Sequence, residues 1–372
     1  MRAAITSHVP SNEHITSATP LKPAESLELK SWIKKQCEHA WIPVWARTPI
    51  MGWRHAYKVT DTSGDLTITI LGESNRRAVE NNVFPIVRSG YDVLSRLSRP
   101  QQAHIVYLPN TRNRALSLDS NTILPSNING GMTTFASQDA IKQPWRILVI
   151  RKEDASKVML HELVHLFALD GRQVPPDIEN RWIKKYDMVK LAPPIERLGI
   201  TEAVTESIAC YMWAEFKCKM TGTPFCGKAL DTRIFEIARL LMHGKKGRKK
   251  MKIVDGTHAF AYIIARAALW DGANGPCKEL FELIDSYPRR AGCNSHLLNI
   301  LDDRLPKLIR KIQRSTSAVY DTSLSIESAI NTRPSSRVNS MQDLRVSDKT
   351  RHSRVSSRQD LRVSDNAVKT RP

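Results

Sequence analysis

Hydrophobic and polar positions follow two different periods along the chain, and the change between them divides it into two halves. In the first half, the run ESLELKSWIKKQCEHAW, which begins at Glu25, has its apolar residues at helical spacing. Residues 55–71, HAYKVTDTSGDLTITIL, alternate with a period of two around a Ser-Gly-Asp turn, which predicts a β-hairpin. The other elements expected in this half are a helix at about 76–98, strands at 101–109 and 144–152, and a long loop between these strands.

After about residue 171 the apolar spacing is almost entirely helical. We expect helices at 200–218, 231–244, 258–270 and 295–313. A mixed sheet with helices, followed by a mostly helical half, is the pattern of an α+β fold. The change in polarity near residue 171 predicts two lobes that meet along one helix.

Both ends of the chain are polar, and we expect them to be disordered. Residues 1–24 contain proline and few large apolar side chains. Residues 315–372 are expected to form a basic tail, in which the part from Arg333 onward has ten Lys or Arg against four Asp. This tail contains a duplicated 13-residue segment, because SRVNSMQDLRVSD (336–348) recurs as SRVSSRQDLRVSD (353–365). The folded domain is therefore expected to span residues 25–314.

The composition is that of a folded protein outside the membrane. The chain has 372 residues, of which 41% are hydrophobic, enough for one large domain or two small ones. No apolar run approaches the roughly 18–20 residues that span a membrane. The N-terminal residues also lack the apolar core of a signal peptide. We therefore expect a protein that is not secreted, has no membrane partner, and works in the cytoplasm or the nucleus.

The six cysteines are scattered and include no CxxC pair. This spacing argues against a zinc ribbon and against a disulfide-dense scaffold. Cys210, Cys218 and Cys226 are spaced by eight residues, and we interpret them as buried thiols on helices and not as a second metal site.

Much of the net charge of +19 is concentrated in two segments. GKKGRKKMK (244–252) has six Lys or Arg in nine residues, and the segment 333–372 is the basic part of the tail. Clustered cations gain affinity for phosphate backbones by releasing counterions, so both segments are candidate contacts for nucleic acid or another polyanion. They support one interpretation of the whole chain, a nucleic-acid-binding or assembly protein whose metal site is structural or degenerate.

Residues 160–170, LHELVHLFALD, carry the strongest chemical signal. His161 and His165 are four residues apart, so on a helix they lie on one face, one turn apart, with Glu162 beside them. The pattern HExxH is typical of a Zn²⁺ site in which the glutamate acts as general base on the metal-bound water. The alternative is a core helix whose histidines bond to the backbone, and it requires three polar groups to be satisfied in one apolar stretch.

The ends of this helix can also be expected from the sequence. Asp154 or Ser156 can cap its first turn, and Asp170-Gly171 can end it. The extended motif HExxHxxGxxH would place its third histidine at residue 171, which is glycine, and Asp170 arrives one residue too early to replace it. A third ligand must therefore come from elsewhere in the chain.

The third ligand is expected from a later helix, in the segment TEAVTE (201–206). This segment resembles the NExxSD pattern of thermolysin-like gluzincins, with threonine in place of asparagine and glutamate in place of aspartate. The resemblance implies that Glu202 is the third zinc ligand and that Glu206, one turn later, orients a ligand histidine. Two alternatives stay open: Glu206 as the ligand in place of Glu202, and an acidic helix face that only contacts solvent.

A wider resemblance covers about residues 125–216. The segments LPSNINGGMTTF, ILVIRKEDASKVMLHELVHLFALD and TEAVTESIACYMWAEF are similar to an uncharacterised viral family assigned as zinc peptidases, found notably in large DNA viruses. The resemblance implies a zincin-like metallohydrolase with one catalytic Zn²⁺, and a viral origin would locate its activity in the host cell. With Glu162 as general base, the expected reaction is hydrolysis of an amide in a peptide or protein substrate. The matching positions are Arg151, Lys152, Glu153, His161, Glu162, His165, Glu202 and Glu206.

Two further features fit such an enzyme. NINGGMTTF (127–135) precedes the strand that leads into the metal helix, where zincins pair an edge strand with an extended peptide. His258 and Tyr262 are four apart on one expected helix face, and they are candidate catalytic groups that stabilise an oxyanion. The alternatives are an ordinary glycine-containing loop, a capping histidine and a core aromatic residue.

Overall fold

The structure of the protein is a computed structural model of the full chain. It describes residues 1–11, 16, 18–72, 76–98, 102–115, 122–134, 145–171, 174–243, 253–286, 295–315 and 325–327. These residues belong to one compact unit, Met1–Thr332. The basic segment 244–252 and the duplicated segments of the tail lie outside the described residues.

A six-stranded mixed sheet forms the first half of the fold, in the order β1-β2-β3-β4-β7-β6. Strands β3, β4 and β7 run parallel to one another, whereas the β1–β2, β2–β3 and β6–β7 pairs are antiparallel. The β2–β3 hairpin confirms the turn predicted from the sequence, where Gly64 has a φ of 78° that favours glycine. The strands are β1 (Thr19–Pro20), β2 (Ala56–Thr60), β3 (Leu66–Leu71), β4 (Ala103–Tyr107), β6 (Gly131–Thr134) and β7 (Trp145–Val149).

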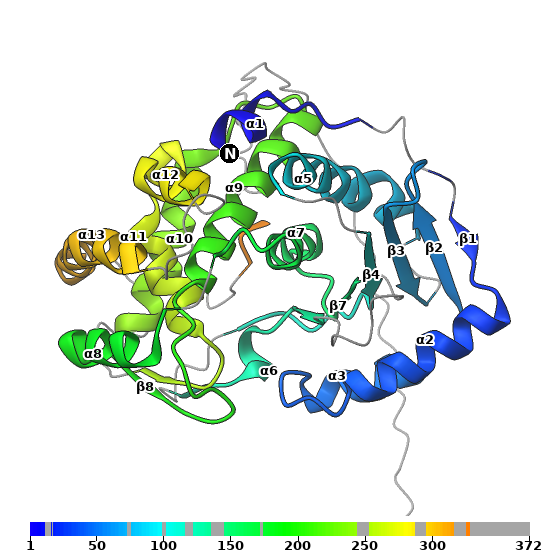
Figure 1. Ribbon diagram of the computed structural model, residues 1–372, viewed down its shortest axis with the longest axis horizontal. Coiled ribbons are helices and arrows are strands. Elements are labelled where there is room, and N and C mark those ends of the chain that lie inside the picture. Colours follow the sequence, from blue (N-terminus) through cyan, green and yellow to red (C-terminus); the bar gives the residue numbers. More distant parts are fainter. Residues whose placement is uncertain are drawn as a thin grey trace, which may run out of the picture. The chain divides into compact units, whose positions relative to one another are not determined.

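The two faces of this sheet are covered by different helices (Figure 1). Successive residues of a strand point to opposite faces, so in β4 Ile105 packs into the larger core and Val106 into the smaller one. The larger core contains α5 (Phe84–Leu97) and α7 (Ala155–Leu166), and the smaller one contains α2 (Pro23–Gln36) and α3 (Val44–Met51). Shorter helical segments of this half are α4 (Arg76–Ala78), the π-helix Val79–Val83 and α6 (Pro125–Ile128).

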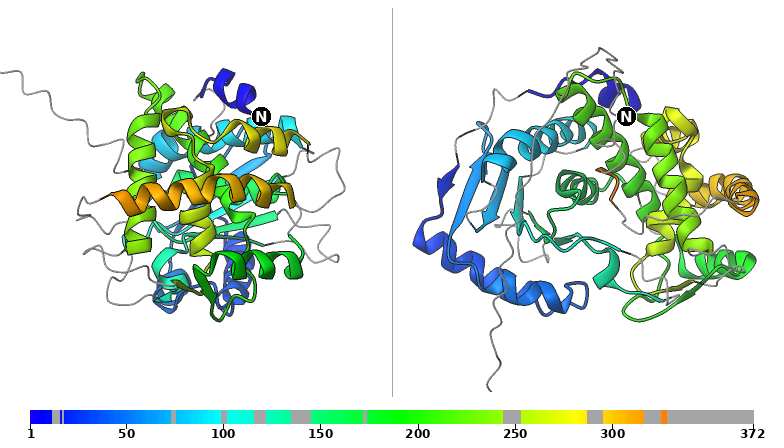
Figure 2. Two further views of the ribbon diagram at one scale, coloured as in Figure 1. Left: turned by 90° about the vertical axis from the view of Figure 1, so that its left-hand side faces the viewer. Right: turned by 180° about the vertical axis from the view of Figure 1, so that it is seen from behind.

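The second half is mostly helical and includes a small parallel sheet in the order β5-β9-β8. Its long helix α9 packs against α7 of the first half, as the right-hand view of Figure 2 shows. A mixed sheet with helices followed by a helical half confirms the predicted α+β class. The small sheet takes β5 (Thr122–Ile123) from the first half of the chain. The elements of the second half are α8 (Pro176–Tyr186), β8 (Val189–Leu191), α9 (Glu202–Met220), α10 (Gly227–His243), β9 (Ile253–Asp255), the π-helix Phe260–Ala265, α11 (Arg266–Leu269), the 3₁₀ helix Gly272–Asn274, α12 (Lys278–Ser286) and α13 (Ser295–Arg314).

The N-terminus is folded where the structure describes it, which corrects the disorder expected for residues 1–24. Helix α1 (Arg2–Ser7) buries Ile5 completely, and strand β1 extends the main sheet. The terminal ammonium of Met1 donates to Oδ1 of Asp285 at 2.7 Å. A few apolar residues are enough to fix this segment, because they pack against core residues from distant parts of the chain.

The packed unit also extends beyond residue 314, where the tail was expected to begin. Ile326 is 1% exposed, and the carboxylate of Asp154 is buried nearby. That carboxylate accepts hydrogen bonds from the Ser325 hydroxyl at 2.9 Å and from the backbone N–H groups of Ile326 and Glu327 at 3.0 Å. Residues 325–327 are therefore part of the fold.

Among the described residues, no helix has both the length and the apolar character needed to cross a membrane.

Candidate metal centre

The HELVH residues lie on α7, which packs against α5 and α9. Asp154 occupies the N-cap position with a φ of 51°, but its side chain does not cap the helix, and Ser156 lies inside the helix. The helix ends at Leu166, earlier than predicted, and Ala168 then takes a left-handed φ of 51°. The predicted caps are therefore wrong, because the Asp154 and Asp170 side chains have other partners.

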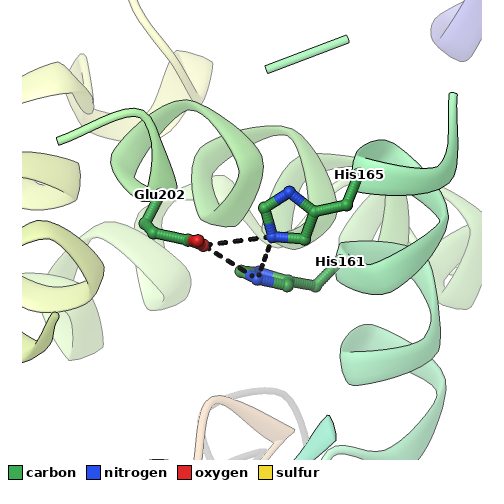
Figure 3. Close-up of side chains that lie close together, drawn as sticks. All are labelled: His161, His165 and Glu202. Atoms are coloured by element: carbon green, nitrogen blue, oxygen red, sulfur yellow. Dashed lines mark hydrogen bonds and ion pairs between the residues drawn. The ribbon is translucent and has the colours of Figure 1, made fainter. Parts of the chain in front are cut away.

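His161, His165 and Glu202 converge on one point (Figure 3). The Nε2 atoms of the two histidines are 3.2 Å apart, and each lies 3.2 Å from Oε2 of Glu202. Glu202 is the first residue of α9, so the three side chains come from both halves of the fold. Within the described part of the chain, this is the one group of His, Cys, Asp or Glu side chains that could hold a metal ion.

The size of this triangle fits a small tetrahedral cation. Ligand atoms about 2.0–2.1 Å from a tetrahedral ion lie roughly 3.3 Å from one another. The three observed separations are 3.2 Å. Ca²⁺ prefers oxygen ligands at about 2.3–2.6 Å and fits neither the spacing nor the imidazoles.

Each of these histidines is oriented through its other ring nitrogen. Nδ1 of His161 lies 3.0 Å from Oε2 of Glu206, and Nδ1 of His165 lies 3.0 Å from Oδ2 of Asp170. A histidine that donates its Nδ1–H to a carboxylate keeps the Nε2 lone pair for a metal. Sequence reasoning interpreted Asp170 only as part of the helix end, whereas the turn at Ala168 brings it back to His165.

Glu206 is also the centre of a buried ion-pair network that sequence reasoning missed. Its Oε1 accepts hydrogen bonds from Nζ of Lys157 at 2.6 Å and from Nη1 of Arg266 at 2.9 Å, and all three side chains are buried. Burial alone would raise the pKa of Glu206, but Lys157, His161 and Arg266 hold it well below its usual range. The available signal was a lysine one turn before His161 on an otherwise apolar helix.

Charged neighbours raise the pKa of His165 and lower the pKa of Glu202. Burial alone would lower the pKa of His165, but Glu202 and Asp170 raise it well above its usual range. Burial alone would raise the pKa of Glu202, but His165 and His161 hold it well below its usual range. These two shifts favour a protonated imidazole beside an ionised Glu202 carboxylate.

Glu162 lies beside the triangle and outside the ligand set. It is 6% exposed and lines the same cavity as both histidines. Its Oε2 accepts a hydrogen bond of 2.7 Å from Oγ1 of Thr133, on the edge strand β6. Gly131 of the same strand is so close that a Cβ there would lie 2.9 Å from Oε1 of Glu162. The segment NINGGMTTF therefore contains the strand that contacts the candidate base.

Tyr262 faces the two histidines of the triangle from the helical half. It lies on the π-helix Phe260–Ala265, and its ring centre is 5.5 Å from that of His161. Burial raises the pKa of Tyr262 well above its usual range, and the nearby carboxylates of Glu202 and Glu162 raise it further. The hydroxyl therefore stays protonated and able to donate a hydrogen bond.

His258 lines the same cavity, but it does not share a helix face with Tyr262. It precedes the helix and has a φ of 57°, so the predicted helical pair is wrong in this respect. Nδ1 of His258 lies 2.9 Å from the carbonyl oxygen of Leu198, and its ring stacks on Trp41 with centres 5.3 Å apart. His258 thus joins the first half of the chain to the second at the cavity wall.

The cavity has a volume of about 270 Å³ and is lined by both halves of the fold. Apolar side chains make up part of its wall: Met132, Val158, Ile237 and Ile263. One titratable cluster, an apolar wall and an edge strand therefore meet in the same cavity.

Comparisons with family models, curated proteins and solved structures find no match to this chain. Functional assignment therefore depends on the geometry of the site alone.

Proposed function

We propose that the protein is a zinc-dependent peptidase with a zincin-like, two-lobed fold. The observation that carries this proposal is the triangle of His161, His165 and Glu202, with edges of 3.2 Å and Glu162 beside it. Two imidazoles and one carboxylate are a ligand set of catalytic zinc, which keeps its fourth position for water or substrate. A structural zinc site would instead use four protein ligands.

The residues around the triangle supply the proton transfers that hydrolysis needs. A zinc ion held there would polarise a carbonyl group and lower the pKa of a bound water to about 7. Glu162 accepts a proton from the attacking water at its carboxylate and delivers it to the nitrogen of the leaving amine. Tyr262 donates its hydroxyl proton in a hydrogen bond to the carbonyl oxygen as that oxygen gains negative charge.

Strand β6 supports a peptide as the substrate. It is the edge strand of the main sheet and pairs with β7 on one side. An extended peptide can add to such an edge through backbone hydrogen bonds. Because Thr133 of the same strand contacts Glu162, a peptide bound there would lie next to the base.

The test compares the wild-type protein with Glu162→Gln at equal zinc content. Glutamine keeps the size of the side chain but accepts no proton, so we expect zinc content and folding to persist. Hydrolysis of a peptide library, measured by mass spectrometry, should fall by roughly 10²–10⁴-fold. The exposed residue Glu38 offers a matched control, and Glu38→Gln should cleave like the wild type.

Other outcomes would contradict this proposal in different ways. Equal cleavage by Glu162→Gln and wild type would place the activity elsewhere. Loss of zinc in the variant would make Glu162 a ligand. No cleavage by a zinc-loaded wild type would favour the rival interpretation, a binding protein with a non-catalytic metal site.

A further inference from the structure

Helix α13 carries a basic surface that lies apart from the hydrolase site. Its apolar side chains are buried against the core, and the helix lies on the outside of the helical half (Figure 2, orange). Four cations on it are exposed: Lys307, Arg310, Lys311 and Arg314. At 3.6 residues per turn they fall within an arc of about 100° and extend over roughly 10 Å of helix. We call these four residues, together with Phe235 of α10, the α13 patch.

The cations of the α13 patch form no ion pair within the described part of the chain. Asp303, one turn before Lys307, lines a neighbouring cavity with that lysine, whereas Asp302 and Glu236 bind other residues. Asp302, on the same helix, accepts a hydrogen bond from Lys185 at 2.7 Å. Glu236, next to Phe235, lies 3.6 Å from Arg233. The positive charge of the patch is therefore available to an external anion.

The patch surrounds a shallow, largely open depression that is bordered by an aromatic ring. A cavity of about 480 Å³ is lined by the four cations, Phe235 and Ser315, and no acid lines it. Phe235 is half-buried, and Nζ of Lys311 lies 4.4 Å from its ring centre. The ring therefore lies between the core and the exposed Lys311 side chain.

We propose that the α13 patch binds single-stranded nucleic acid. Proteins that bind single strands combine a positive groove for the phosphates with aromatic rings on which bases stack. The four cations supply the positive surface for the phosphates, and Phe235 supplies the aromatic ring. When a base stacks on Phe235, Lys311 moves from the ring to a phosphate.

A membrane surface fits the patch less well than a nucleic acid. Binding to a bilayer usually adds apolar side chains that enter the interface. The large hydrophobic side chains that are exposed in the described structure lie elsewhere, at Val9, Leu27, Val44, Met51 and Leu124. Phosphate contacts with base stacking therefore match the surface more completely.

The test uses the full chain and a fluorescently labelled oligo(dT), with binding followed by anisotropy at several salt concentrations. In the patch variant, Lys307, Arg310, Lys311 and Arg314 are each replaced by Gln. Each lost phosphate contact lowers the salt slope of log Kd by about 0.7. We expect the slope to fall by about 2–3 and the affinity at low salt to fall at least roughly tenfold.

A matched control removes four cations from other exposed positions, Lys34, Lys35, Lys184 and Lys190, and should bind like the wild type apart from a small general charge effect. Phe235→Leu keeps an apolar side chain against the core but removes the stacking surface, and should weaken binding about tenfold with an unchanged salt slope. If the patch variant has a lower melting temperature, the pairs Lys307/Lys311 and Arg310/Arg314 can be replaced separately.

Equal losses in the patch and control variants would overturn the proposal, because only net charge would then matter. An unchanged oligo(dT) affinity in the patch variant, with lost binding to phosphatidylserine vesicles, would overturn it in favour of a membrane surface. Both results are independent of peptidase activity.

Discussion

The hydroxyl of Thr133 donates a hydrogen bond of 2.7 Å to the Glu162 carboxylate, from the edge strand that borders the cavity. A carboxylate that acts as a base must keep one orientation, and this bond fixes it. In the proposed peptidase, Thr133→Val keeps the shape of the side chain but removes the donor. We expect kcat to fall by about 10–100-fold, since a hydrogen bond to a charged group contributes about 1.5–3 kcal/mol.

Thr133→Ser is the matched variant, because it keeps the hydroxyl and loses only a methyl group. It should restore most of kcat, and zinc content should be the same in both variants, since Thr133 contacts no ligand atom of the triangle. The measurement is steady-state cleavage of a peptide identified in the library digest. Equal rates for the Val and Ser variants would show that Glu162 is positioned by other contacts.

Asp170 and Glu206 have the same relation to their histidines but different surroundings, which predicts different consequences of removing them. Asp170→Ala should weaken zinc binding by about 10–100-fold, as is typical of a lost partner of a ligand histidine. Glu206→Ala should also destabilise the fold by about 3–5 kcal/mol, because it leaves Lys157 and Arg266 buried without their counter-charge.

Zinc competition with a chelator and urea unfolding separate these two effects. Glu202→Ala provides the reference, since loss of a ligand should cost more zinc affinity than loss of either partner. Weaker zinc binding in Glu206→Ala than in Glu202→Ala would mean that Glu206 is the ligand.

The parts of the site that follow from local spacing could be predicted from the sequence. His161 and His165 share a face because any helix brings residues four apart together, and α7 is helical there. The β2–β3 hairpin is similarly local, since its strands are joined by a short turn at Gly64. For the same reason the alternation of helix and strand patterns was enough to give the α+β class.

The parts that depend on tertiary contacts could not be predicted in this way. Asp170 reaches His165 only because Ala168 takes a left-handed conformation, which alanine rarely adopts. Thr133 meets Glu162 through the pairing of β6 with β7, and no sequence spacing encodes that contact. Ile5 is a similar case, because the few apolar residues of this polar segment form no clear period.

The contacts of residues 325–327 predict two different outcomes of shortening the C-terminus. Removal of residues 333–372 should leave the free energy of unfolding nearly unchanged, because this segment has few apolar side chains. Removal from Ser325 onward should cost about 3 kcal/mol or more, since it exposes the Ile326 site and removes three donors from the buried Asp154 carboxylate.

Urea unfolding of the two shortened proteins makes the comparison. Ile326→Ala in the full chain should destabilise by about 2–5 kcal/mol, the usual cost of removing a buried isoleucine side chain. Equal stabilities for the two shortened proteins would mean that residues 325–327 contribute little to the fold.

His104, on strand β4, predicts a pH dependence of stability that is separate from the candidate metal centre. Burial lowers its pKa to about 4 from an ordinary 6.5, and the cations of Arg146 and Lys58 add to this shift. Its Nε2 lies 2.7 Å from the Thr69 hydroxyl. Between these two pKa values the unfolded chain binds a proton that the folded chain does not. Stability contributed by neutral His104 is therefore present above about pH 6.5 and is lost as the pH falls towards about 4, at up to about 1.4 kcal/mol per pH unit.

The variant His104→Gln removes this titration while keeping a polar group beside Thr69. Urea unfolding of both proteins across this pH range gives the difference in their free energies of unfolding, in which the titration of shared carboxylates largely cancels. We expect the wild type to lose stability relative to His104→Gln as the pH falls, and the difference to level off below about pH 4. Parallel stability curves would show that His104 gains a proton as readily in the folded chain as in the unfolded one, and that its burial in β4 does not exclude charge.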